Sequence, residues 1–428
     1  MLKLLYRKIE LLKLNNSFSV ILKGAVLGQL FQIIAIPILT RFFSNGEFGV
    51  FSYFMSLNAI LLTFISGKYE LSLLILDNQR LKNGFLATLI LTFLVFSILL
   101  LLTFFKPLIF FAIRWISFRI LLLSLLTSLF MALVVLFSEL FLRLSETKWY
   151  SYFKIINPLL TSIFSIVFGY FYVSNGLVYG IMLGTFITLV VQVTRLIQLK
   201  FFENVNLNLG EMKTFFLEHI KFPLFYTPGQ LLNSLVGFFT VFFITKLSGP
   251  EALGLFFMAD RIGALFTNTL GLALRDHFRS QAVYKIKKGE LFKYHINYTG
   301  RLILLIALCI SLFYVFSFYL STLLGDDWTE LEQVFRILLI YFFFQFVNLP
   351  TSGVMVVIEA QKIDFIWQLF YLATTVISFY FFEVGDDFLN IMFVFATFRS
   401  VAYLVQIILT LYLSYKSDNL YCNETSKN

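Results

Sequence analysis

The sequence is poor in the residues on which soluble proteins and metal sites depend. Charged residues fill 13% of its 428 positions and hydrophobic residues fill 59%. A typical water-soluble domain has about 25% charged residues, so that class is excluded. The chain has only two cysteines, Cys309 in an apolar run and Cys422 near the C-terminus. They suggest neither a disulfide pair nor a metal site.

Residues arranged for catalysis are also missing. The three histidines, His219, His277 and His295, stand in or beside charged stretches, where we expect solvated side chains. The chain has no Gly-rich phosphate loop, no metal-ligand spacing and no specific nucleophile motif. We therefore predict no catalytic residue, no metal, no cofactor and no enzyme activity.

Long apolar runs dominate what is present. Runs near 20 residues recur from end to end, the length that an α-helix needs to cross a bilayer. The sequence therefore predicts an all-α polytopic membrane protein with twelve transmembrane helices. The predicted spans are Phe18–Leu39, Phe48–Ser66, Gly84–Phe105, Ile120–Leu142, Tyr152–Val173, Leu177–Leu199, Phe222–Leu247, Leu253–Leu274, Leu302–Leu323, Val334–Ile358, Phe365–Phe382 and Phe388–Leu413.

The distribution of Lys and Arg predicts the orientation. With the N-terminus in the cytoplasm, most of the 33 basic residues fall on the cytoplasmic side, as the positive-inside rule requires. Both termini and the basic segment Arg275–Arg301 are then cytoplasmic, and the late outer loops are acidic. This bias explains the net charge of +9 without nucleic acid. The basic segment also suits anionic lipid headgroups, although topology alone explains it.

A polar stripe in the second span has a distant counterpart. Small or polar residues recur at helical spacing from Ser52 to Glu70, on one face if the helix continues that far. The same face reappears 205 residues later, where Gly254 matches Gly49 and Arg261 matches Ser56. We interpret this as an internal duplication whose two polar faces line a shared water-filled cavity. The first stripe comprises Ser52, Ser56, Ala59, Thr63, Ser66 and Glu70.

The longest polar stretch before the second half divides the spans six and six. We predict a first lobe at 1–200, a cytoplasmic linker at 201–221, a second lobe at 222–414 and a cytoplasmic tail at 415–428.

Two arginines are predicted within the membrane. A charge at the centre of a span costs about 2.5–3.5 kcal/mol on insertion scales and commonly marks a functional site. Arg261 and Arg399 are the candidates, and a structural ion pair is the alternative for Arg261. For Glu70, a solvated helix end explains the residue nearly as well. The full set of predicted substrate-binding residues is Arg261, Arg399, Asn268, Asn233, Ser56, Thr63 and Glu70.

Five segments share their order and spacing with a known family: Gly67–Ser72, Leu81–Asn83, Phe222–Pro223, Leu231–Ser234, and Ala252–Phe256 with Arg261. They resemble bacterial polysaccharide flippases of the multidrug/oligosaccharidyl-lipid/polysaccharide exporter superfamily. The resemblance covers essentially the whole chain, and the order and spacing of the segments are its most specific feature. One departure concerns symmetry, because Ser56 stands where the second lobe has Arg261.

The resemblance implies both a fold and a function. The fold is a V-shaped transporter of two six-helix lobes around a basic central cavity. The substrate is an undecaprenyl-diphosphate-linked oligosaccharide, carried across the bacterial inner membrane for O-antigen, lipopolysaccharide or capsule assembly. Membrane lipid and a polysaccharide polymerase are the implied partners.

Two alternatives remain at this stage. A drug/cation antiporter of the same fold is expected to carry a carboxylate in its first span, and Phe18–Leu39 has none. A membrane oligosaccharide polymerase or ligase would carry a long outer loop with catalytic Arg or His, and no predicted outer loop is long.

Overall fold

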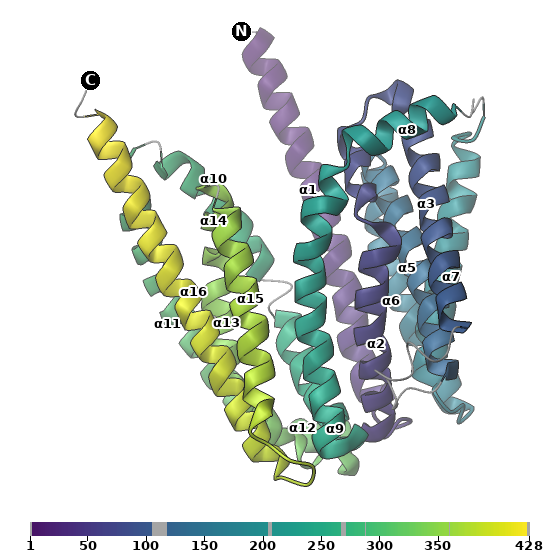
Figure 1. Ribbon diagram of the computed structural model, residues 1–428, viewed down its shortest axis with the longest axis vertical. Helices are drawn as coiled ribbons and strands as arrows, with labels where there is room; N and C mark the ends of the chain where they lie inside the picture. Colours follow the sequence, from purple (N-terminus) through teal and green to yellow (C-terminus); the bar gives the residue numbers. More distant parts are fainter. Residues whose placement is uncertain are drawn as a thin grey trace. The chain divides into compact units, whose positions relative to one another are not determined.

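All regular secondary structure in the described residues is helical. The computed structural model describes residues 2–104, 118–203, 208–266, 271–286, 288–358 and 360–425. Within these ranges ten helices are long and apolar enough to cross a membrane (Figure 1). The prediction of an all-helical, multi-pass membrane protein is therefore confirmed. The count of twelve spans in two six-helix lobes remains a prediction.

Helix α9 (Thr227–Phe266) contains parts of two predicted spans. Gly249 interrupts it with φ 87° and ψ 178°, and Pro250 follows. Glycine tolerates this positive φ because it has no Cβ, and proline is well suited to the first turn of the helix that resumes. One continuous element is thus divided at Gly249, between the predicted spans Phe222–Leu247 and Leu253–Leu274.

The chain forms two compact units. Unit 1 consists of Met1–Phe43 and Tyr53–Ser234, and unit 2 consists of Ser44–Ser52 and Leu235–Asn428. Helix α2 (Asn45–Ser66) therefore contributes its first residues to unit 2 and the rest to unit 1.

Unit 1 is built around aromatic and leucine side chains. Phe85, Leu140, Phe141 and Leu196 are fully buried in its main cluster. Burial of such side chains stabilises a fold by about 1.5–3 kcal/mol each in water; inside a membrane, close packing has to supply most of that. Besides α2 and the start of α9, its elements are α1 (Leu2–Leu39), the 3-10 helix η1 (Tyr69–Ile75), α3 (Asn78–Phe104), α5 (Phe118–Arg143), α6 (Thr147–Tyr170), α7 (Gly176–Gln198), α8 (Leu209–Glu218) and the π-helix η2 (Phe222–Tyr226).

Unit 2 is organised around α13 and α16, which pack against each other and against α11 (Figure 1). The aromatic rings of Tyr341, Phe342 and Phe395 are fully buried there. The first turns of α2 join this unit through edge-to-face contacts of Phe48 with Trp328 and of Phe51 with Phe257. Its elements after α9 are α10 (Leu272–Ile286), α11 (Leu291–Ser317), α12 (Leu320–Leu324), η4 (Asp326–Trp328), α13 (Leu331–Thr351), α14 (Val354–Val357), α15 (Gln361–Tyr380) and α16 (Phe388–Thr425).

Candidate functional site

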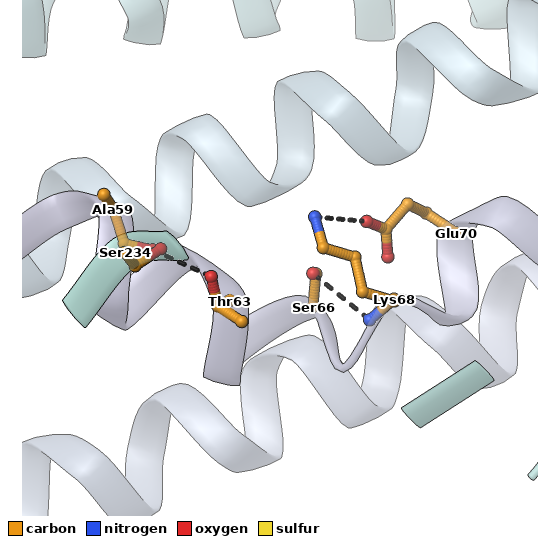
Figure 2. A network of polar contacts seen from close by, with 6 residues as sticks. All are labelled: Ala59, Thr63, Ser66, Lys68, Glu70 and Ser234. Carbon is orange, nitrogen blue, oxygen red and sulfur yellow. Dashed lines mark hydrogen bonds and ion pairs between the residues drawn. The ribbon is translucent and has the colours of Figure 1, made fainter. Parts of the chain in front are cut away.

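The predicted polar stripe of α2 satisfies its hydrogen bonds mainly within its own helix. The Ser56 hydroxyl donates to the Tyr53 carbonyl at 2.8 Å, and the Thr63 hydroxyl donates to the Ala59 carbonyl at 2.9 Å. Ser234, near the start of α9, also donates to the Ala59 carbonyl, at 3.3 Å (Figure 2). Ala59 is exposed and Ser56 is half-buried, whereas Thr63 is buried. Ser52, Thr63, Ser66 and Glu70 are buried, so Ser56 is the polar member of the stripe that keeps an accessible side chain.

The prediction that one helical face continues to Glu70 is wrong. Helix α2 ends at Ser66, and the next two residues turn the chain with left-handed φ values of 53° at Gly67 and 60° at Lys68. The Ser66 hydroxyl accepts a hydrogen bond from the Lys68 amide at 3.4 Å. Glu70 then lies in the first turn of a separate element, η1, which begins at Tyr69. Two consecutive residues at positive φ cannot continue a right-handed helix, so Glu70 is positioned by this turn.

Glu70 is a buried charge with one cationic partner. It is 1% exposed, and its Oε1 lies 3.6 Å from Nζ of Lys68 (Figure 2). Its other carboxylate oxygen has no hydrogen-bond partner among the described residues. Such burial excludes a solvated helix end. A buried carboxylate is costly unless it is paired, so Lys68 is the group that makes this position tolerable.

Tyr69 fixes the same turn to α8. Its hydroxyl donates to the Phe216 carbonyl at 3.4 Å, and its ring meets the Phe216 ring edge to face. Burial raises the pKa of the Tyr69 hydroxyl. The group therefore stays a neutral hydrogen-bond donor at physiological pH, and it holds η1 against the segment predicted to be the linker.

Arg399, on α16, lies in an aromatic enclosure within unit 2. It is 8% exposed, and its guanidinium carbon is 4.5 Å from the ring centre of Phe395, 5.3 Å from that of Tyr371 and 5.5 Å from that of Tyr341. One guanidinium nitrogen donates to the Thr240 hydroxyl at 3.4 Å. Cation–π contacts of desolvated groups are worth about 2 kcal/mol or more, so the rings replace part of the lost hydration.

A carboxylate belongs to the same cluster. Tyr341 donates a hydrogen bond to Asp260, and the hydroxyls of Tyr371 and Tyr403 are 2.9 Å apart. Sequence reasoning missed Tyr341 and Tyr371 because they lie on α13 and α15, far from Arg399 in the chain. Tyr403 lies four residues after Arg399 and therefore shares its face of α16.

Arg261 differs from Arg399 in its surroundings. It is only partly buried on α9, and it makes no hydrogen bond or ion pair with any residue that the structure describes. The predicted alternative of a structural ion pair thus has no partner within the described ranges. Of the two arginines predicted within the membrane, Arg261 is thus the one without a described hydrogen-bond or ion-pair partner.

The remaining predicted residues are separated. Asn233 is exposed on α9 within unit 1. Asn268 lies outside the described residues. Ser56, Thr63, Glu70 and Asn233 therefore belong to unit 1, and Arg261 and Arg399 belong to unit 2. No cluster of three or more His, Cys, Asp or Glu side chains suited to a metal occurs among the described residues.

Comparison with known proteins is informative at the level of family and fold. Residues 14–275 match the family described as polysaccharide biosynthesis protein. No curated protein matches the chain.

Two solved transporters of the MOP superfamily resemble the fold. A multidrug resistance MATE family transporter in an inward-facing conformation aligns with a TM-score of 0.65 at 15% identity, over 91% of this chain and 96% of its own. A MOP superfamily transporter from Pyrococcus furiosus aligns with a TM-score of 0.59 at 14% identity, over 94% and 96%. At these identities the likeness shows a MOP-type fold.

Proposed function

From the finding that this chain belongs to the polysaccharide biosynthesis protein family, we propose that it flips a lipid-linked oligosaccharide across the bacterial inner membrane. Its family and fold are those of a membrane transporter, not of an enzyme. In our proposal the cargo is a repeat unit on undecaprenyl diphosphate, moved from the cytoplasmic to the periplasmic leaflet for surface polysaccharide assembly.

The proposal depends on one observation, that Arg261 has no hydrogen-bond or ion-pair partner among the described residues. A guanidinium inside a membrane is costly, and here none of the described residues pairs with it. Arginine binds phosphate oxygens through two parallel hydrogen bonds, so a diphosphate is a fitting counter-charge. Arg399 is less available, because aromatic rings and Thr240 surround its guanidinium. Direct phosphate binding by Arg399 remains a prediction from the sequence.

The accessible polar groups suit the sugar part of the cargo. Ser56 and Asn233 present a hydroxyl and an amide that are not fully buried, and both hydrogen-bond readily to sugar hydroxyls. The membrane potential assists outward movement of the diphosphate, by roughly 4–5 kcal/mol for two charges at 100 mV.

Substitution of Arg261 tests the proposal. Purified protein in proteoliposomes would be given an undecaprenyl-diphosphate-linked oligosaccharide, and its appearance in the opposite leaflet would be measured. We expect Arg261→Ala to lose at least tenfold in rate and Arg261→Lys to retain part of it, because Lys keeps the charge without the planar fork. Lys246→Ala, which removes an exposed cation from the same helix, is the control. An Arg261→Ala protein that flips the cargo at the wild-type rate would show the phosphate-binding role to be wrong.

A further inference from the structure

A basic cavity lies in unit 2 where α10 leads into α11. Its volume is about 260 Å³. Three cationic side chains and one carboxylate surround it, together with an amide and two tyrosine rings. The lining residues are Lys285, Glu290, Lys293, Tyr294, Asn297, Tyr298 and Arg301.

Only one of the three cavity cations forms an ion pair with a described residue. Lys285 and Glu290 form an ion pair of 2.6 Å, and the hydrogen bond from Lys285 lowers the pKa of the Glu290 carboxyl. Lys293 and Arg301 form no hydrogen bond or ion pair with any described residue. With three cations and one carboxylate, the cavity therefore keeps an excess of positive charge next to the amide of Asn297, a donor set that suits the oxygens of a phosphate ester.

A second cavity at a helix end differs in its charges. It lies in unit 1, has a volume of about 250 Å³ and includes Arg80, Asn83, Glu211 and Glu218 in its lining. There Arg80 is paired with Glu218 at 3.1 Å, and Asn83 donates to Glu211 at 2.5 Å. The cation of that cavity is thus paired with a carboxylate, unlike Lys293 and Arg301 in the α11 cavity.

The face of α11 that lines the cavity becomes apolar in the turns that follow Arg301. Lys293, Asn297 and Arg301 are spaced four residues apart, so they share one face of the helix. Leu304, Leu308 and Leu312 continue that face with exposed fractions of 75%, 61% and 63%. The step from Arg301 to Leu304 is about 4.5 Å along the helix axis.

This face of α11 is the kind that meets lipid. Within the most apolar stretch of α11, only 17% is buried inside the protein, which is the lowest share among the ten described helices that could span a membrane. A charged patch followed by an exposed leucine row has the same polarity profile as a phospholipid, with a headgroup above hydrocarbon chains.

The walls of the cavity are held in place from two sides. Asp418, on α16, accepts hydrogen bonds from the Leu291 and Phe292 amides at 3.0 and 2.8 Å, which caps the start of α11. The Tyr298 hydroxyl donates to the Leu274 carbonyl of α10 at 3.1 Å. These contacts reduce the cost of ordering the site when a ligand binds.

We propose that this cavity binds the phosphate headgroup of a membrane lipid, whose chains then lie along the exposed leucines of α11. Lys293 and Arg301 hold the phosphate oxygens, and Asn297 donates between them. The site is separate from Arg261 and does not depend on the proposed transport.

Lipid titration tests this site directly. Phosphatidylglycerol would be added to the full-length protein in detergent while its thermal midpoint is followed, and native mass spectrometry would count the retained lipids. We expect Lys293→Gln/Arg301→Gln to weaken binding at least tenfold, and the charge-preserving Lys293→Arg/Arg301→Lys to stay within about threefold of wild type. Lys362→Gln/Lys416→Gln removes two exposed cations elsewhere in unit 2 and should bind as wild type does.

Two further probes identify the source of the phosphate. Tighter binding of undecaprenyl phosphate than of phosphatidylglycerol would assign the site to the carrier lipid, and the reverse order would assign it to bulk phospholipid. Inorganic phosphate at the same concentration should have no effect, because it lacks the chains. An equal response to inorganic phosphate, or equal lipid binding by the Gln variant and wild type, would overturn the proposal.

Discussion

Gly49 and Gly254 pack reciprocally against each other's helix within unit 2. A Cβ on Gly49 would lie 1.9 Å from the Pro250 carbonyl oxygen, and one on Gly254 would lie 1.8 Å from the Asn45 carbonyl oxygen. Pro250 follows Asn45 by the same 205 residues by which Gly254 follows Gly49. The sequence offset that relates the two polar stripes therefore also relates the two sides of this crossing, as in an isologous contact.

Adding a methyl group on either side of the crossing should destabilise the protein to a similar extent. We expect Gly49→Ala and Gly254→Ala each to cost about 1–3 kcal/mol, the range for overpacking, because the clash is with backbone and not with a flexible side chain. Thermal unfolding in detergent would measure the loss. Gly237→Ala is the control, since nothing lies within 4 Å of its added Cβ, and alanine is favoured over glycine within a helix.

The double substitution separates one shared crossing from two independent sites. If the first methyl group already pushes the helices apart, the second adds less than its own single effect. Strictly additive losses, or a loss at only one of the two glycines, would contradict the reciprocal contact.

Removing Lys68 should cost more than neutralising its partner. Lys68→Ala leaves the buried Glu70 carboxylate unpaired, which costs about 3–5 kcal/mol for a buried pair. Glu70→Gln leaves only Lys68, whose side chain is 19% exposed and can be hydrated. The measurement is the thermal midpoint of both variants and of the Lys68→Ala/Glu70→Gln double variant, which should recover part of the loss.

An exposed ion pair in the same unit is the matched control. Lys200 and Glu203 lie 3.4 Å apart with side chains 74% and 60% exposed, and such pairs contribute about 0–1 kcal/mol. If Lys68→Ala destabilises no more than Lys200→Ala, the Glu70 carboxylate does not depend on Lys68.

Substitution of Arg399 should lower the stability of the protein, whatever its effect on transport. Arg399→Ala empties the space between three aromatic rings, and truncation of a large buried side chain costs about 2–5 kcal/mol. Arg399→Met fills the space with a thioether that packs well on aromatic rings, so we expect it to recover more than half of the loss. Abundance in the membrane and the thermal midpoint would measure this.

The flipping assay then separates the two roles of Arg399. A stable Arg399→Met protein that cannot move the cargo would support the sequence-based prediction of a phosphate ligand. Wild-type stability of Arg399→Ala would instead contradict the packing role.

The predicted orientation is testable by labelling single cysteines in intact cells. In a background with Cys309 and Cys422 replaced by serine, Lys288→Cys and Val384→Cys each place a thiol at an exposed position. Position 384 should react with a membrane-impermeant maleimide, and position 288 should react only after permeabilisation. The opposite pattern would invert the topology.

The helical membrane fold could be predicted because its signal is local. A run of about 20 apolar residues identifies a span without any knowledge of its neighbours. The end of α2 could not be placed in the same way. Small and polar residues keep helical spacing up to Glu70, yet Gly67 and Lys68 adopt left-handed φ values. The helix therefore ends at Ser66, four residues before the sequence pattern does.

Burial of single polar residues depends on contacts that sequence spacing does not show. His295 was expected in solvent because of its charged neighbours, but it is fully buried, with Nδ1 2.8 Å from the Ser414 hydroxyl of α16. One signal was present: Leu291, His295 and Thr299 share one face of α11, and all three are buried. Spacing showed only part of the surroundings of Arg399: Phe395 lies four residues before it on α16, whereas Tyr341 and Tyr371 come from α13 and α15.

The nine residues Ser44–Ser52 are encoded far ahead of the rest of the unit to which they belong. A gene fragment for residues 235–428 would therefore lack Phe48 and Phe51, whose rings cover Trp328 and Phe257. Recombination that exchanges second halves between relatives separates these matched pairs, so a viable chimera must carry the short segment along with its own second half. The segment Ser44–Ser52 and the second half of the gene are therefore expected to be inherited together.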